Sequence, residues 1–268
     1  MTQPDTSNQQ HSKVFDEYSR YYDLLYRDKD YASEADYVAG LIRRFHPHAH
    51  SILELGAGTG IHARLLAEKG FLIHGVERSP AMLDRAHKLS GDYKQHHLES
   101  TLSFSGGDLR TIRLSQSFDA VIALFHVISY QTSNQDVEAA FHTARYHLNH
   151  GGIFIFDVWY GPAVLTQRPS VRIKRIADEN LVITRLAEPD LRPNENIVDV
   201  NYHVFIRELS TNTNHELKET HRMRYFFKPE IELIACQTGF NLLCFEEWLT
   251  GTTASSDTWG ICYVLEAQ

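Results

Sequence analysis

The sequence contains few cysteines and no long apolar run. Its three cysteines are odd in number and lie late in the chain, at Cys236, Cys244 and Cys262. This pattern is typical of reduced thiols in the cytoplasm and not of a disulfide framework. No apolar run approaches membrane-spanning length, and residues 1–10 are polar and lack the charged and apolar regions of a signal peptide. We therefore expect a cytoplasmic protein with no membrane partner.

An excess of positive charge is also absent. The chain has 26 Lys and Arg against 34 Asp and Glu, a net charge of −8, which argues against a broad nucleic-acid surface but not against a local basic pocket. Hydrophobic residues make up 43% and charged residues 22%, the balance of a soluble globular protein. At 268 residues the chain is long enough for one large domain, or for a domain with an insertion.

Histidine is abundant, but its pattern does not indicate a metal site. The chain has 16 histidines, and the densest group is His46-Pro47-His48-Ala49-His50. The proline breaks any helix there, and no nearby cysteine or carboxylate pattern completes a ligand set. We expect a solvated loop at this point and no bound metal.

One stretch, residues 51–60 with the sequence SILELGAGTG, organises the rest of the chain. An apolar run of strand length ends at Glu54-Leu55, passes the alternate glycines Gly56, Gly58 and Gly60, and leads into a helical pattern. This predicts a strand, a tight turn and a helix N-terminus, where backbone N–H groups face a ligand.

A second carboxylate supports a ligand site at this turn. Glu77 ends the next apolar segment and lies 17 positions after Gly60 (77 − 60 = 17), where a second strand places a carboxylate under a ribose. The G-x-G-x-x-G pattern of hydride-transfer folds is not met, because position 61 is Ile61. The alternative is an ordinary strand-to-helix turn that binds nothing.

Together these residues resemble the cofactor site of the class I S-adenosylmethionine-dependent methyltransferases. The resemblance rests on Glu54-x-Gly56-x-Gly58-x-Gly60, then Glu77, then Gly107-Asp108-Leu109. It implies that the glycine turn lies beside the methionine part of the cofactor, that Glu77 takes the ribose hydroxyls and that Asp108 meets the adenine amine. The cofactor-binding residues it implies are Tyr22, Glu54, Gly56, Ala57, Gly58, Gly60, Glu77, Arg78, Met82, Asp108, Leu109, Leu124 and Phe125.

The N-terminal segment predicts two helices, at residues 15–27 and 32–45, with tyrosines at helical spacing. Such a stripe is either packing or a lid over the cofactor cleft. Tyr22-Asp23-x-x-Tyr26, followed by Lys29-Asp30-Tyr31-Ala32-x-Glu34, resembles the lid of bacterial sugar-nucleotide N-methyltransferases, which methylate dTDP-linked aminosugars. By this resemblance Tyr26 takes the place of that family's active-site tyrosine.

The middle of the chain alternates between helix and strand. Helices are predicted at residues 61–69, from Ser79-Pro80 onward and at 134–148, and strands at 71–76, up to Ser105, at 118–124 and at 153–158. After residue 162 the alternation stops. Four β-rich segments, at 171–176, 181–186, 196–207 and 217–227, with turns at 189–194 and 210–214, predict an antiparallel insertion. A helix at 229–238 and strands at 240–248 and 258–266 complete the pattern.

The fold class we expect is α/β: a class I methyltransferase, Rossmann-like, seven-stranded mixed sheet with helices on both faces and an antiparallel β insertion after strand 5. The chain divides into a helical lid at residues 1–50, a cofactor-binding core at 51–160, an insertion shaping the acceptor pocket at 161–228, and a helix with the last two strands at 229–268.

The end of the fourth strand is a second candidate for chemistry. Strand carboxyl ends face the ligand crevice in open α/β sheets, which places His126 beside the transferable methyl group. His126 is either a general base or a pocket wall without chemistry, because imidazole titrates near neutral pH. Tyr26 and His126 are the candidate catalytic residues.

The acceptor pocket draws on residues from the second half of the chain. Trp159 and Tyr160 match the order of the aminosugar N-methyltransferases and are expected to shape the pocket with Tyr26. Arg222 and Arg224 are candidates for a nucleotide diphosphate, since guanidinium forks suit phosphate oxygens. The alternative is a pair of surface arginines on an alternating strand.

Three functions remain open from the sequence. The first is transfer of methyl from S-adenosyl-L-methionine to the amine of a nucleotide-linked aminosugar, with the protein a monomer or homodimer. The second is O-methylation of a sugar or small natural product. The third is a sensor or scaffold that binds the cofactor without turnover. Nucleic-acid partners are not expected, given the acidic charge.

Overall fold

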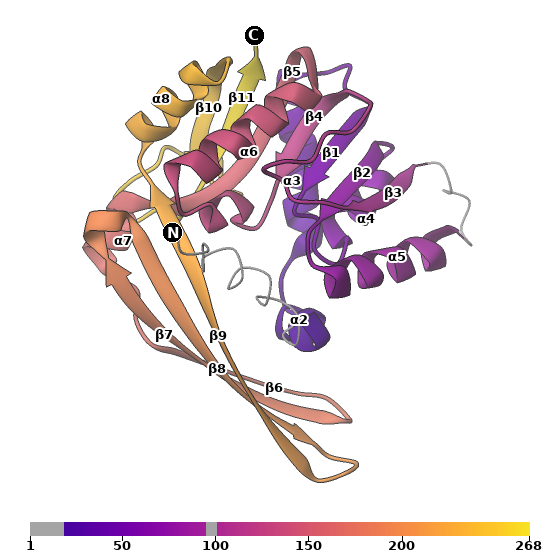
Figure 1. Ribbon diagram of the computed structural model, residues 1–268, viewed down its shortest axis with the longest axis vertical. Coiled ribbons are helices and arrows are strands. Elements are labelled where there is room, and N and C mark those ends of the chain that lie inside the picture. Colours follow the sequence, from indigo (N-terminus) through magenta and orange to yellow (C-terminus); the bar gives the residue numbers. More distant parts are fainter. Residues whose placement is uncertain (1–18, 95–100) are drawn as a thin grey trace, which may run out of the picture.

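The computed structural model describes residues 19–94 and 101–268 (Figure 1). The polar segment at 1–10 therefore lies outside the described residues. The predicted helix at 15–27 begins outside them, and its described part is α2 (Ser19–Leu25). In the described ranges, no helix combines the length and apolar composition needed to cross a bilayer. The same ranges hold no cluster of three or more His, Cys, Asp or Glu side chains arranged for a metal ion.

Seven strands form the core sheet. Across the sheet they run β3 (Leu102–Gly106), β2 (Leu72–Glu77), β1 (Ser51–Leu55), β4 (Phe118–Ala123), β5 (Leu148–Tyr160), β11 (Gly260–Ala267) and β10 (Phe240–Glu247). The first five are parallel, and β11 is antiparallel to both of its neighbours. This confirms the α/β class I methyltransferase fold expected from the sequence.

Helices cover both faces of this sheet (Figure 1). One apolar cluster joins strand residues such as Ile52 and Ile122 to α3 (Tyr31–Phe45), α4 (Ile61–Glu68) and α5 (Pro80–Lys94). A second cluster joins the alternate residues, such as Leu53 and Val121, to α6 (Asn134–His147) and α8 (Lys228–Gln237). Because successive strand side chains point to opposite faces, the near-continuous apolar runs of the parallel strands serve both layers.

Four further strands form a long antiparallel arm: β6 (Arg172–Ala177), β7 (Leu181–Arg192), β8 (Ile197–Glu208) and β9 (Thr213–Phe226). The arm joins the core sheet where Trp159 and Tyr160 of β5 pair in parallel with Tyr225 and Phe226 of β9. Within the described residues, the four strands of the arm therefore continue the seven expected core strands in one sheet of eleven. Strand β5 has 13 residues and β4 only six, so the end of β5 passes β4 and is free to pair with β9.

Two local predictions were wrong. No helix was predicted between the fifth strand and the insertion, but α7 (Gly161–Gln167) follows β5 directly. Pro162 lies in its first turn, where a missing N–H costs nothing. The turn expected at 189–194 begins later, because β7 continues through Pro189 to Arg192 and the chain turns at the 3-10 helix η2 (Pro193–Glu195). Strand β6 pairs with β7 only as far as Ala187 of β7. Pro189 therefore lies on a free edge of β7, where its missing N–H interrupts no ladder hydrogen bond.

Gly75 on β2 tests the packing under the glycine turn. A Cβ atom at this position would lie 2.4 Å from Cδ1 of Phe104 and 2.9 Å from Cβ of Ala57. Because both neighbours are in the core, we expect Gly75→Ala to lower the free energy of unfolding by about 1–3 kcal/mol in urea titrations.

The matched control is Gly40→Ala in the middle of α3, where a Cβ would meet no atom within 4 Å. This control should raise the free energy of unfolding by about 0.5–1 kcal/mol, because alanine loses less backbone entropy than glycine in a helix. Equal denaturation midpoints for the two variants would contradict the packing argument.

Candidate active site

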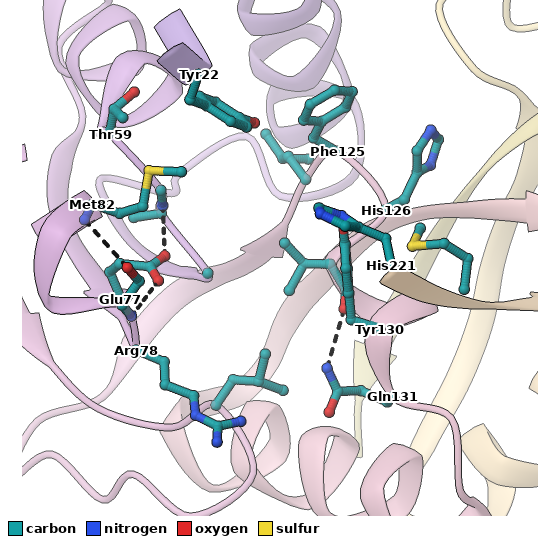
Figure 2. Close-up of a pocket in the computed structure, with 18 of the residues that line it drawn as sticks. Tyr22, Thr59, Glu77, Arg78, Met82, Phe125, His126, Tyr130, Gln131 and His221 are labelled. Carbon is teal, nitrogen blue, oxygen red and sulfur yellow. Dashed lines mark hydrogen bonds between the residues drawn. The ribbon is translucent and has the colours of Figure 1, made fainter. Parts of the chain in front are cut away.

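A cavity of about 930 Å³ lies at the carboxyl ends of β1, β2 and β4, with β8 and β9 of the arm as its opposite wall. This is where ligands bind in open parallel sheets. Figure 2 shows Glu77, Arg78 and Met82 on one side and His126, Tyr130 and His221 on the other. The volume of the cavity is near the upper end of the roughly 300–1,000 Å³ typical of ligand pockets.

The glycine turn closes one end of the cavity with an unusual backbone. Gly56, Gly58 and Gly60 all have positive φ, at 75°, 56° and 83°. At Gly56 a Cβ would also lie 2.8 Å from both Cγ atoms of Val127. Glycine is therefore required at Gly56 by both conformation and space. The turn brings the start of α4, at Ile61 and His62, to the same end of the cavity.

Glu77, the last residue of β2, holds the turn in place. Its carboxylate accepts hydrogen bonds from the N–H groups of Gly58, at 2.8 Å, and Ser79, at 2.7 Å. Burial raises the pKa of Glu77, and these N–H groups offset the increase only in part. The side chain lies at the cavity wall, so it meets both the turn and any ligand in the cavity.

Asp108 follows β3 and lines the same part of the cavity. Its Oδ2 lies 2.6 Å from Arg110 Nη2, and Arg78 Nη1 is 3.6 Å away. Burial raises the pKa of Asp108, but the hydrogen bonds and charge of Arg110 outweigh it and leave the pKa below its usual value. The group is therefore an ionised acceptor at neutral pH.

His126 follows the end of β4 in a strained backbone. Phe125 and His126 have φ values of 64° and 62°, in the left-handed region that non-glycine residues rarely enter. Such residues cost about 1–3 kcal/mol each and cluster at functional sites. The His126 N–H donates to the carboxylate of Asp157 on β5, at 3.2 Å from each oxygen.

Asp157 also lies close to the imidazole of His126, with 2.6 Å between His126 Nδ1 and Asp157 Oδ2, although the two groups are not aligned as a hydrogen bond. The aspartate is only 1% exposed. Sequence reasoning missed it, although a carboxylate inside the apolar run of β5, residues 148–160, was a visible signal. The negative charge of this carboxylate favours a proton on Nδ1, which leaves Nε2 of the ring as the atom available for a proton from a ligand.

Helix α2 covers the cavity from the N-terminal side. Tyr22 and Tyr26 line it, with ring centroids 4.7 Å apart, and Tyr26 meets the ring of Phe125 edge-on at 5.2 Å. Asp23 fastens the helix to the core by accepting from Thr59 Oγ1 at 3.1 Å and Arg85 Nη1 at 2.7 Å.

The other side of α2 is fastened to the arm. Lys174 on β6 donates to the backbone carbonyl of Leu25 at 2.7 Å, and Arg185 on β7 donates to the Tyr26 hydroxyl at 3.2 Å. Leu25 also packs with Ile183 in a small apolar cluster between helix and arm. Helix α2 therefore links the two walls of the cavity (Figure 1).

A buried acidic cluster lies beneath the glycine turn. His62 on α4 is 2.7 Å from Glu34 Oε2 and 4.0 Å from Glu54 Oε1, and Lys29 pairs with Glu34. Glu54 is 1% exposed, and its Oε2 has no hydrogen-bond partner among the described residues. Burial, and then the charge of Glu77, raises the pKa of Glu54 to about 8.

Most of the residues predicted from the sequence come together here. Those that line the cavity are Tyr22, Tyr26, Gly56, Ala57, Gly58, Glu77, Arg78, Met82, Asp108, Leu109, Leu124, Phe125, His126, Trp159 and Arg222. Four predicted residues are not among its lining residues: Glu54, Gly60, Tyr160 and Arg224.

The four have identifiable positions elsewhere. Glu54 is buried below the turn, and Gly60 forms the N-cap of α4. Tyr160 packs its ring against Phe245, 5.7 Å away. Arg224 is buried; its Nη2 donates to Asn134 Oδ1 at 2.7 Å and pairs with Glu230, while its Nε has no partner among the described residues.

Comparisons with known proteins agree with this geometry. A family described as a methyltransferase domain matches residues 52–152. The dTDP-3-amino-3,6-dideoxy-alpha-D-glucopyranose N,N-dimethyltransferase of Streptomyces fradiae is 28% identical over 228 residues, 84% of each chain. The dTDP-3-amino-3,4,6-trideoxy-alpha-D-glucopyranose N,N-dimethyltransferase of Streptomyces venezuelae is 34% identical over 143 residues. That second match covers 53% of this chain and 56% of the relative.

A solved structure extends the likeness over nearly the whole chain. The amino pentose methyltransferase from Micromonospora echinaspora superposes with a TM-score of 0.72 at 23% identity, covering 95% of this chain and 98% of the other. At that identity the likeness speaks for the fold.

The chain has the fold of the class I S-adenosylmethionine-dependent methyltransferases, and its glycine turn, acids and matched domain agree with that class. It is an enzyme, and its cofactor is S-adenosyl-L-methionine. Within that class it is similar to bacterial sugar N-methyltransferases.

The raised pKa of Glu54 predicts a pH-dependent stability. In the unfolded chain this carboxyl loses its proton near its ordinary pKa of 4.5, whereas the folded protein holds the proton to about pH 8. Its contribution is complete below the unfolded pKa and is lost as the pH rises toward the folded pKa. Glu54→Gln, which cannot ionise, should therefore gain stability relative to the native chain from pH 5 to pH 8 (about the range between the two values).

The measurement is urea unfolding of both proteins without cofactor across that range. The control is Glu68→Gln on α4, an exposed carboxylate paired with Arg64, which should follow the native curve. Parallel curves for Glu54→Gln and the native protein would show that Glu54 ionises normally in the fold.

Proposed function

We propose that the enzyme transfers the methyl group of S-adenosylmethionine to the amino group of a nucleotide-linked aminosugar. The observation that carries this proposal is one cavity with a cofactor turn at one end and His126, held by Asp157, on the other side. The names of its relatives, which are N,N-dimethyltransferases of dTDP-aminosugars, support the same acceptor class.

The residues of this chain fit the cofactor. When bound, S-adenosylmethionine supplies a methyl group made electrophilic by its sulfonium. Glu77 would accept hydrogen bonds from the ribose hydroxyls and Asp108 one from the adenine amine, while the backbone at Gly56 and Gly58 approaches the methionine part. Apolar contacts and the remaining wall would come from Tyr22, Ala57, Arg78, Met82, Leu109, Leu124 and Phe125.

Glu54 and Gly60 would act on the cofactor indirectly. Gly60 shapes the turn through its left-handed backbone. Glu54 lies at the end of β1 below the turn, and its Oε2 has no partner among the described residues. Because its pKa is raised to about 8, the carboxyl is protonated at neutral pH, and a nearby sulfonium would favour its ionised form.

His126 and Tyr26 would act on the acceptor. A neutral amine attacks a sulfonium methyl without prior loss of a proton, so the main task is alignment, which can contribute about 7–11 kcal/mol in well-oriented intramolecular reactions. Tyr26, which directly follows α2, would position the acceptor from the lid side of the cavity. His126 Nε2 takes the proton that the amine must lose for a second transfer, and Asp157 stabilises the resulting imidazolium.

The arm would bind the rest of the acceptor. Trp159 lines the cavity beside His126, with ring centroids 6.1 Å apart, and Tyr160 supports it from the core. Arg222 lines the wall, although its Nε already lies 2.9 Å from Asp199 Oδ1. Arg172, also a wall residue, has a side chain with no ion pair or hydrogen bond within the described residues. We assign the diphosphate to Arg172 and Arg222, since both line the cavity and Arg224 does not.

A second candidate, O-methylation, is favoured by the same His126–Asp157 pair. An imidazole oriented by a buried carboxylate is the arrangement that activates a hydroxyl nucleophile. The two functions differ in how much they depend on the base, because a hydroxyl must lose its proton during the attack and a neutral amine need not.

The proposed function is tested by mass spectrometry after incubating the protein with S-adenosylmethionine and a panel of nucleotide-linked amino- and hydroxy-sugars. A gain of one or two methyl masses confined to the amino-bearing members is expected. A gain on hydroxy-sugars that lack the amine would replace the proposal with O-methylation. No gain on any member would contradict both functions.

Substitution of His126 separates the two chemistries. For an amine acceptor, His126→Ala should lower kcat by about tenfold or less, the value of one lost hydrogen bond. For a hydroxyl acceptor the loss should be about 10²–10⁴-fold, the usual contribution of a general base. The rate is measured at saturating acceptor, with His142→Asn, an exposed histidine on α6, as the control that should leave kcat unchanged.

A further inference from the structure

A chain of three hydrogen-bonded side chains crosses the acceptor side of the cavity. Tyr130 ends the 3-10 helix η1 (Val127–Tyr130), and its hydroxyl is 2.8 Å from Nδ1 of His221 on β9. The other ring nitrogen, His221 Nε2, is 3.2 Å from Oε2 of Glu219. Tyr130 and His221 both line the cavity, and Figure 2 shows them together on the side of His126, across from Glu77.

The chemistry of the three groups gives the chain a direction. A neutral imidazole has one donor and one acceptor nitrogen, and a carboxylate only accepts. With Glu219 at Nε2, the proton of the ring lies on Nε2, which leaves Nδ1 as an acceptor. The Tyr130 hydroxyl therefore donates to Nδ1, and its oxygen offers lone pairs, not a proton, to other groups.

The surroundings of His221 favour the neutral ring. The side chains of His221 and Glu219 are only 4% and 8% exposed. Burial lowers the pKa of His221, against the opposing effect of Glu219, so the ring is neutral near pH 7. The ring of Tyr202 meets it edge-on at 4.8 Å, and Arg185 lies 4.8 Å over the Tyr202 ring.

We propose that Tyr130 binds the acceptor by accepting a hydrogen bond from one of its N–H or O–H groups, and that His221 and Glu219 are positioning residues that set this polarity. The proposal rests on the proposed function and deepens it. Tyr130 follows the β4 end that carries His126, and His221 belongs to the arm, so the contact joins the two walls around the acceptor.

This polarity has a consequence for an amine acceptor. A phenol oxygen that holds one N–H fixes the direction of the nitrogen lone pair, which is the alignment on which methyl transfer depends. Primary and secondary amines both retain an N–H for this bond. A neutral tertiary amine has none, so the contact favours release of a dimethylated product.

The test uses two nearly isosteric variants, Tyr130→Phe and Glu219→Gln. The first removes the acceptor oxygen. In the second, the amide introduced at position 219 can donate to Nε2 of His221, which permits the other tautomer of the ring. Nδ1–H of His221 then donates to the Tyr130 oxygen, and the hydroxyl proton of Tyr130 turns toward the cavity. Each should lower kcat/KM for the aminosugar by about two- to tenfold, the fold-change that corresponds to one neutral hydrogen bond.

The double variant carries the decisive comparison. Because Glu219 acts through the Tyr130 hydroxyl, Glu219→Gln should have no further effect on kcat/KM in a Tyr130→Phe background. The affinity for S-adenosylmethionine, measured by titration calorimetry, should stay within about twofold in all three proteins, which also shows that they fold. Additive losses, or losses matched by weaker cofactor binding, would show a merely structural role and overturn the proposal.

A matched control lies on the opposite face of the arm. His203 on β8 pairs with Glu216 in the same chemistry, and it follows Tyr202, which lines the cavity, so its side chain points the other way. His203→Gln should leave kcat/KM unchanged. If Tyr130→Phe and Glu219→Gln resemble this control, the inference is wrong.

Two further arms of the experiment separate the outcomes. A lower kcat with every aminosugar would identify the amine as the group that Tyr130 binds. A higher KM that returns to the native value with an analogue lacking the neighbouring hydroxyl would identify that hydroxyl. Both outcomes support the proposal. If the native protein methylates no aminosugar in the panel, the proposed function fails and the inference fails with it. If the native protein is active and the variants are unaffected, only the inference fails.

Discussion

The far end of β5 is the point on which the site depends. This strand continues past β4, and the extra residues do two things at once: Asp157 holds His126 at the end of β4, and Trp159 and Tyr160 pair with β9. The second contact anchors the arm across from the glycine turn. Without the overhang there would be a cofactor crevice but no opposite wall.

The charges in the site are arranged around buried carboxylates. Glu54 and Asp157 are each 1% exposed and lie beside the cavity, and Glu77 is partly buried in its wall. Two of them have raised pKa values because burial penalises the charged form. A nearby positive charge lowers that penalty, so the desolvation that raises these pKa values also favours a sulfonium ligand.

A feature could be predicted from the sequence where it depends on neighbouring residues, and not where it depends on packing between distant segments. The glycine turn, Glu77 and Asp108 could be found because they lie at strand ends, where local pattern determines position. Arg224 could not be distinguished from Arg222 by pattern, since both lie on the same face of β9, and only packing shows that Asn134 and Glu230 engage it. The length of β7 was underestimated because Pro189 is tolerated only where β6 has already ended.

The sequence by itself determined the parallel core, the cofactor turn, the four-stranded arm and the position of His126 in the chain, because apolar period, glycine and strand-end acids act over a few residues. Only the tertiary structure decided which polar groups meet: Asp157 with His126, Asp23 with Arg85, and Glu219 with Tyr130 through His221. These pairs join segments far apart in the chain, and a hydrogen bond forms only within about 3 Å, so they depend on how the sheet, arm and lid pack together.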